Sequence, residues 1–240
     1  MTDLSFAAIA ALGNILGGLA AARGAKLGIK VISGFLAFSA GFMISVALLR
    51  MLPEAIERGG ANAALFVLIG YLLVHLTQHT AVQHFHFGEE THEVTHAAGI
   101  SALVGLLLHT FFDGVAIASG FAVSPVLGTL VFLAIVLHKL PEGLAIASIQ
   151  IAGGTRPSRA IGSAALLGAA TLIGALTTDA VGFLTTHGLA LSAGVTLYVG
   201  ASNLVPEFQR KSGYGLAVVF FLGALVAWGA GVVMGAVGLH

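Results

Sequence analysis

Apolar segments long enough to cross a membrane account for most of this chain. Their approximate bounds are 4–22, 30–52, 61–83, 97–121, 125–151, 160–185, 188–208 and 214–238. About 20 apolar residues in a helix span the ~30 Å hydrocarbon core of a bilayer, where the backbone must satisfy its own hydrogen bonds. Only 8% of the residues are charged, whereas soluble domains carry about 25%. The sequence therefore predicts an all-α, polytopic membrane helix bundle of eight transmembrane helices, forming a single transmembrane domain over residues 1–240.

The composition narrows the chemistry and the partners. The chain has no cysteine, so a metal site would have to use histidine, carboxylate, methionine or asparagine. The formal net charge is zero and no basic run is present, so we expect membrane lipids and not nucleic acid as partners. The chain opens on Met-Thr-Asp without a basic region, and we therefore expect the first segment to be a retained helix and not a signal peptide.

Basic residues gather in the connections on one side of the predicted bundle. The connections after the first, fifth and seventh segments hold Arg23, Lys26, Lys30, Arg156, Arg159, Arg210 and Lys211. The other side holds only Arg50 and Arg58, and Lys139 lies within a segment. Positive charge favours the cytoplasmic side. We therefore expect a protein of the cell (inner) membrane with both termini outside the cytoplasm and a histidine-rich connection, 84–96, inside it.

Two neighbouring segments carry the same polar motif. HTFFDGVAIAS (109–119) aligns with HKLPEGLAIAS (138–148), which matches His109 with His138 and Asp113 with Glu142. A histidine and a carboxylate at this spacing lie on one face of a helix. Both pairs lie near the middle of their segments, where titratable groups are costly and need a partner. Imidazole and carboxylate together suit Zn²⁺ and also Fe²⁺, Mn²⁺, Co²⁺ and Cd²⁺.

Two interpretations of this repetition are open. Each pair could form a structural hydrogen bond to a neighbouring helix, or both pairs could meet as a four-ligand metal site. The identical spacing and depth favour the metal site. A second pair of similar sequences, Leu52-Pro53-Glu54 and Val205-Pro206-Glu207, predicts an inverted repeat. Such repeats are typical of transporters. Chance also produces such short matches in an apolar chain.

These motifs resemble the ZIP family of divalent-metal transporters. In that family H-x-x-x-[ED]-G on the fourth helix and H-x-x-P-E-G on the fifth bind the transported ion. The resemblance implies that His109, Asp113, His138 and Glu142 form the primary site, on two central metal-binding helices. It further implies import of a divalent cation, zinc first, a homodimer, and movement of the first, fourth, fifth and sixth helices as one body.

The chain departs from the family pattern at two positions that serve a second ion in some members. Thr110 and Lys139 follow the two motif histidines. An ammonium group has no lone pair to offer a metal and repels a cation. We therefore predict one bound ion, with Lys139 paired to Asp113, Glu142 or Asp179 in place of the second.

Further candidate ligands are less specific. The resemblance makes Met43 a soft extra ligand, although methionine also fills gaps in packed bundles. It also places Asp179, the only acid of its segment, at or beside the site. Histidine-rich tracts bind divalent metal weakly, which would apply to His84, His86, His92 and His96. A solvated linker is the alternative for that tract.

An intramembrane zinc-dependent hydrolase is the competing function. It would require three fixed ligands, an activated water and a general base. The HExxH sequence of the chain, HEVTH (92–96), lies in the polar connection and not in an apolar segment, and the paired motifs distribute ligands evenly instead of leaving an open position. Nothing in the sequence argues for a metal-gated signalling protein. A transporter is therefore the leading hypothesis, and an enzyme is not expected.

Overall fold

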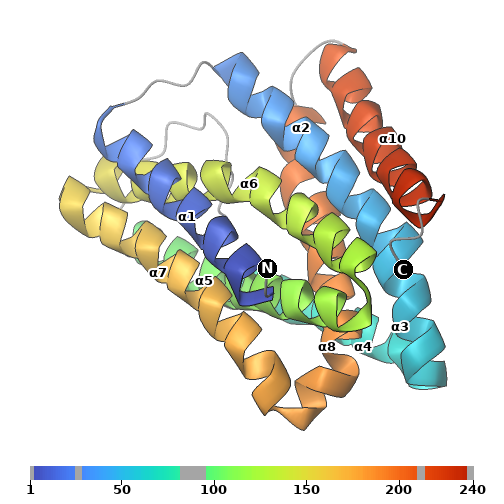
Figure 1. Cartoon of the computed structure of the whole chain (residues 1–240). Coiled ribbons are helices and arrows are strands. Elements are labelled where there is room, and N and C mark those ends of the chain that lie inside the picture. The colour runs from blue at the N-terminus through green and yellow to red at the C-terminus, as the bar shows by residue number, and fades with distance from the viewer. Residues whose placement is uncertain (1–2, 25–28, 82–95, 210–213, 237–240) are drawn as a thin grey trace.

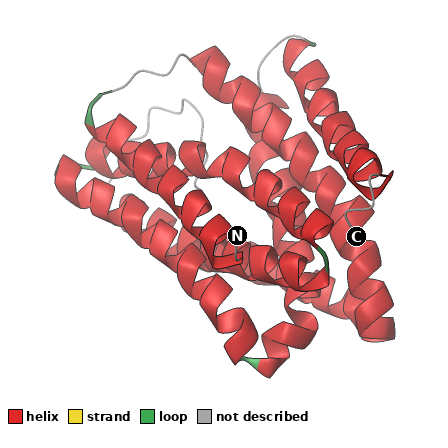
Figure 2. Cartoon of the chain, viewed as in Figure 1, coloured by secondary structure: helices red, strands yellow, loops and turns green. Residues whose placement is uncertain are grey.

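The computed structural model describes residues 3–24, 29–81, 96–209 and 214–236. Nearly all of these residues are helical, and no strand occurs among them (Figure 2). The elements are α1 (Asp3–Ala22), α2 (Ile29–Val46), η1 (Ala47–Met51), α3 (Leu52–Gly59), η2 (Gly60–Asn62), α4 (Ala63–Ala81), α5 (His96–Val123), α6 (Pro125–Ala152), α7 (Pro157–Ala180), α8 (Gly182–Tyr198), η3 (Val199–Leu204), α9 (Val205–Gln209) and α10 (Gly215–Ala236).

The helices have the length and the outward apolar surface of a membrane bundle. By length and composition, six candidate spans lie in the described residues, and the apolar helix Ala63–Gln78 is shorter. Large apolar side chains face outward, including Trp228 and Leu225 on α10, which are 56% and 60% exposed. Lipid is as apolar as these side chains, so such exposure is expected of a protein embedded in a bilayer. The predicted polytopic helix bundle is confirmed.

Mutual glycine contacts join the helices in pairs. Gly114 of α5 lies against the carbonyl oxygen of Thr171 on α7, and Gly174, one turn further along α7, lies against the carbonyl oxygen of Phe111. A side chain at either glycine would collide with backbone, so the small residues are what let the helices approach closely. Reciprocal glycine contacts of the same kind join α1 to α6, α2 to α10 and α4 to α8.

These contacts divide the bundle into two groups. α1 packs against α6 and α7, and α5 packs against both of those helices. Figure 1 shows α1 crossing α6, with α2 and α10 side by side at the edge of the molecule. α4 pairs with α8. α5 and α6, which carry the polar motif, therefore belong to the group of four formed with α1 and α7.

The pairing pattern is that of an inverted repeat. Replacing α1, α2, α4 and α5 by α7, α8, α10 and α6 converts each glycine-joined pair into another such pair. The π-helical turns η1 and η3 precede Pro53 and Pro206 in the corresponding places. The positions of corresponding helices in the order of spans differ by an odd number, so the two helices cross in opposite directions. The repeat predicted from the two Pro-Glu sequences is thus present in the helix packing.

Local hydrogen bonds fix two helix ends. Ser124 caps α6, because its Oγ accepts a hydrogen bond from the amide of Leu127 at 3.2 Å. The predicted boundary between 160–185 and 188–208 is wrong, because α7 ends at Ala180 and α8 begins at Gly182. Thr185 donates from its hydroxyl to the carbonyl oxygen of Thr178 at 2.9 Å. That bond across the corner lets a polar stretch become the first turn of α8.

Candidate metal centre

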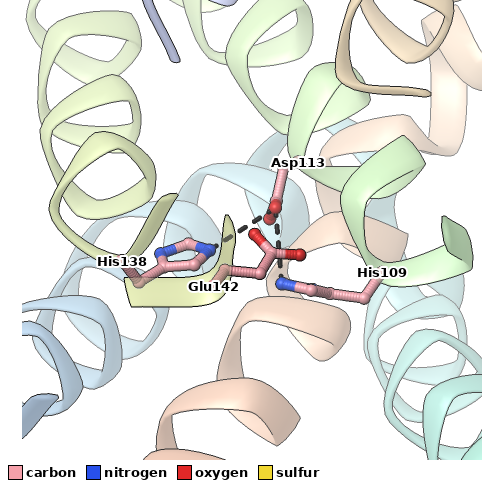
Figure 3. A group of neighbouring side chains, drawn as sticks. All are labelled: His109, Asp113, His138 and Glu142. Carbon is pink, nitrogen blue, oxygen red and sulfur yellow. Dashed lines mark ion pairs between the residues drawn. The ribbon is translucent and has the colours of Figure 1, made fainter. Parts of the chain in front are cut away.

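The four motif side chains meet inside the bundle. His109 and Asp113 project from α5, and His138 and Glu142 project from α6, toward one point (Figure 3). One ligand atom from each residue lies within 4.8 Å of the others. All four side chains are buried, none being more than 6% exposed. The spacing of the motif places each pair on one helix face, and the packing of α5 on α6 brings the two faces together.

Asp113 is the centre of this cluster. Its Oδ2 atom lies 3.4 Å from Nε2 of His109 and 3.5 Å from Nε2 of His138. Atoms that bind tetrahedral zinc through bonds of 2.0–2.1 Å lie about 3.3 Å apart. The separations around Asp113 therefore have the scale of a zinc coordination shell.

A backbone contact orients the ring of His138. Its Nδ1 atom lies 3.1 Å from the carbonyl oxygen of Ala134. A carbonyl can only accept, so Nδ1 donates, and in a neutral ring the lone pair then belongs to Nε2. That nitrogen faces the Asp113 carboxylate, which also offers lone pairs. A cation between the two atoms would satisfy both, and fixing the ring through its other nitrogen is a recurrent feature of metal-binding histidines.

The ammonium group of Lys139 is already held by the two acids. Its Nζ atom lies 2.6 Å from Asp113 Oδ2 and 2.9 Å from Glu142 Oε2, and the side chain is fully buried. These are two of the three pairings expected for Lys139. A buried charge is tolerated only when it is paired and hydrogen-bonded. The lysine therefore compensates charge within the cluster.

Thr110 supplies a contact that sequence reasoning missed. Its hydroxyl donates to Glu142 Oε1 at 2.7 Å, so that the two oxygens of Glu142 are held by Thr110 and Lys139 respectively. Both of these residues directly follow a motif histidine. Thr110 and Lys139 occupy matching positions in the repeated motif, and this match was the sequence feature that pointed to a shared contact with Glu142.

Asp179 is not brought to the cluster. It is exposed near the end of α7 and lines a separate pocket with Arg58, Ser119 and His187. Gly114, which follows Asp113, contacts Thr171, so the cluster lies beside Thr171 of α7. Asp179 lies two turns further along α7. The expectation of a buried acid beside the site, paired with Lys139, is therefore not met in the described part of the chain.

The remaining candidates are placed as follows. Met43 is fully buried in α2, which packs against α6. His84, His86 and His92 lie outside the described residues. α5 begins at His96, whose side chain also lies outside the described part of the structure.

Comparison with known proteins connects this geometry with a family. A family model described as "ZIP Zinc transporter" matches residues 88–237, which include all four side chains of the cluster. The chain belongs to the ZIP family. The family assignment from the paired motifs is confirmed.

Individual ZIP relatives match a smaller part of the chain. It is 27% identical over 154 residues to "Zinc transporter ZIP9-B" of Xenopus laevis, covering 59% of this chain and 51% of the relative. It is also 27% identical over 155 residues to "Zinc transporter ZIP9" of Micropogonias undulatus, covering 59% and 50%. The chain thus spans about half the length of the curated relatives it matches.

Proposed function

We propose that this protein carries a divalent cation, zinc first, across the membrane and into the cytoplasm, through a site formed by His109, Asp113, His138 and Glu142. Membership of a family of zinc transporters supports the reaction class. Fe²⁺, Mn²⁺, Co²⁺ and Cd²⁺ suit the same donor atoms. Met43 is proposed as a further, softer ligand reaching the ion from α2.

One observation carries the proposal. Lone pairs of two imidazoles and two carboxylates converge in a buried volume, and an ammonium group is bound there already. Purely structural hydrogen bonds would pair a donor with an acceptor, whereas in the neutral ring of His138 both Nε2 and the Asp113 Oδ2 atom that it faces offer lone pairs. Transport also requires release, and a ligand set that is partly neutralised by a tethered ammonium holds an ion less tightly.

The same ammonium supports binding of a single ion. With both acids ionised, Lys139 reduces the charge of the cluster to one negative. Two divalent cations would then lie close together in a medium of low polarity with little compensation. We therefore propose one ion at the site, which metal analysis of the purified protein tests directly, since two ions per chain would contradict it.

The hydrolase alternative gains no support. The matched relatives are named as zinc transporters. The cluster lacks a free general base, because both acids are engaged by Lys139, and Glu142 also accepts from Thr110. A transporter accounts for the paired motifs without an additional group.

The test is uptake into liposomes. The protein is reconstituted into vesicles that hold a zinc-sensitive dye, and zinc is added outside. Influx is expected with the intact chain, and its loss is expected with His138→Ala. His75→Ala, which removes an exposed histidine on α4, is the matched control. Absence of influx with the intact chain refutes transport, whereas unchanged influx and zinc affinity in His138→Ala refute the site.

Direction, membrane and assembly form the rest of the proposal. The distribution of basic residues supports external termini in the cell membrane, and the family resemblance favours a homodimer. Glycine contacts that join α1, α5, α6 and α7 support movement of these four helices as one body. Cross-linking of the protein in native membranes tests the dimer.

A further inference from the structure

The inverted repeat makes it possible to compare each contact with its counterpart. α2 and α8 both contain Ser-Ala-Gly, at 39–41 and 192–194, ahead of Pro53 and Pro206 at equal spacing. The glycines of these tripeptides make the mutual contacts with α10 and α4. Ser39 of α2 therefore corresponds to Ser192 of α8.

The two serines differ in what they bind. Ser192 donates from its hydroxyl to the carbonyl oxygen of Phe112 on α5 at 3.2 Å. Ser39 is fully buried, yet its hydroxyl has no hydrogen-bond partner among the described residues. The repeat that aligns His109 with His138 also aligns Phe112 with Pro141 of α6. The counterpart of the observed bond, from Ser39 to the Pro141 carbonyl oxygen, is thus not formed.

The serines that end the repeated sequence of α5 and α6 differ in burial, again with the contact formed on the α8 side. Ser119 and Ser148 end the repeated Ala-Ile-Ala-Ser sequence. Ser119 is buried against Gly188 of α8 and is 6% exposed. Ser148 is exposed, and Phe35 of α2, the counterpart of Gly188, is 53% exposed. α8 therefore covers the end of α5, whereas α2 leaves the end of α6 uncovered.

The difference between the two halves is local. α2 packs against α6 as α8 packs against α5, but the serine hydrogen bond and the covered serine occur only where α8 meets α5. In transporters built from inverted repeats, alternating access comes from rocking of one part against the other around a central site. The opposite state would then exchange the two arrangements, with α2 covering α6 and α8 leaving α5.

We infer that Ser192 and Ser39 form alternative helix-to-helix contacts that hold the two end states of the transport cycle. Ser192 bonds to the Phe112 carbonyl in the state observed, and Ser39 bonds to the Pro141 carbonyl in the opposite state. A buried hydroxyl without a partner is unfavourable, so each serine stabilises the state in which it is paired. This inference rests on the proposed transport function.

Single-cysteine labelling tests the inference, because the chain has no cysteine. Ser119→Cys and Ser148→Cys are introduced separately into the full chain, and labelling by a membrane-impermeant thiol reagent is followed in proteoliposomes with reagent on both sides. In the otherwise unchanged chain, Cys at 148 should label faster than Cys at 119. Equal or reversed rates would overturn the inference.

Serine variants then shift this balance in opposite directions. Ser192→Ala should raise labelling at 119 and lower it at 148, by up to about tenfold, the effect of losing one hydrogen bond. Ser39→Ala should lower labelling at 119 further, and Ser192→Thr should restore the original pattern. Ser163→Ala, on the exposed face of α7, is the control and should change neither rate.

Two outcomes contradict the inference and separate it from the proposed function. If Ser192→Ala raises labelling at both positions, the serine is merely structural, and if it changes neither, the contact does not set the state. Zinc influx is measured in the same vesicles. Reciprocal labelling shifts without influx would leave the inference standing and refute transport, whereas influx with unshifted labelling would do the reverse.

Discussion

At the scale of single residues, the cluster is a site that carries its own cation. Lys139 is bound to both acids at hydrogen-bonding distance, and its side chain is fully buried. Removing one partner of a buried ion pair leaves a charge without compensation, which is more costly than never having placed the pair there. The lysine is therefore the residue whose loss should reveal most about the site.

Replacing Lys139 by methionine tests this role. The variant keeps a long apolar stem but leaves Asp113 and Glu142 facing each other, so the metal-free protein should lose about 3–5 kcal/mol of stability. Zinc should restore it and should shift the unfolding temperature more than in the intact chain, because a cation then supplies the missing charge. Unfolding in detergent with and without zinc measures both effects.

Lys30→Met serves as the matched control, because Lys30 is exposed at the start of α2. It should leave the unfolding temperature and the response to zinc unchanged. A Lys139→Met protein that is as stable without zinc as the intact chain would show that the ammonium is not needed to balance the acids.

The Thr110 hydroxyl has a smaller and separable role. Thr110→Val keeps the side-chain shape but removes the hydrogen bond to Glu142 Oε1. Groups that orient a metal ligand typically contribute 10- to 100-fold to affinity, so zinc affinity should fall by about tenfold. Competition with a zinc-binding dye measures it. Affinity equal to that of the intact chain would show that Glu142 needs no second donor.

Sequence reasoning located the four side chains of the cluster and the pairing of Lys139 with its acids, but not the other contacts around them. The repeated histidine and acid fixed which side chains share a helix face, and the cost of burial required them to meet. The partner of Thr110 and the distance of Asp179 from the cluster depend on where α7 ends and on how α5 and α6 rotate against each other. The end of α7 and the rotation of α5 against α6 are set by contacts between helices that are distant in the sequence, so local sequence patterns do not predict them.

At the scale of helices, glycine contacts determine how the elements are held. The helices themselves were predictable from length and hydropathy, and the cap of α6 from Ser124 and Pro125. The π-helical turns before Pro53 and Pro206 were not, because the inserted residue changes no apolar pattern. The repeated Ser-Ala-Gly of α2 and α8 was readable, but its meaning required the packing of both helices.

Gly114→Ala tests the contact between α5 and α7. The added methyl group would collide with the carbonyl oxygen of Thr171, so the helices must separate. Overpacking of this kind costs about 1–3 kcal/mol, which a lower unfolding temperature would report. Gly162→Ala is the control on α7 itself, because a methyl group there meets no atom within 4 Å. It should not lower the unfolding temperature, and equal losses in both variants would refute the contact.

At the scale of the whole molecule, the chain is two interlocked halves around one polar centre. Each half contributes one of the two helices that carry the histidine and acid cluster, and each glycine-joined pair links one helix of each half and has a symmetry-related counterpart. A repeat of this kind gives the bundle two equivalent ways to close. The amino-acid differences between the halves, such as Gly188 against Phe35, then decide which way is more stable at rest.

The orientation of the chain in the membrane decides whether the proposed cycle would import or export the ion, and it can be tested without metal. Lys and Arg are enriched in the connections after α1, α6 and α9, and positive charge is retained on the cytoplasmic side during insertion. A tag fused ahead of α1 should therefore bind antibody on intact cells from which any outer wall has been removed. A tag inserted at Gly154, in the turn between α6 and α7, should bind only after the membrane is permeabilised. The reverse pattern would show that the chain has the opposite orientation in the membrane, and the proposed transport would then be export.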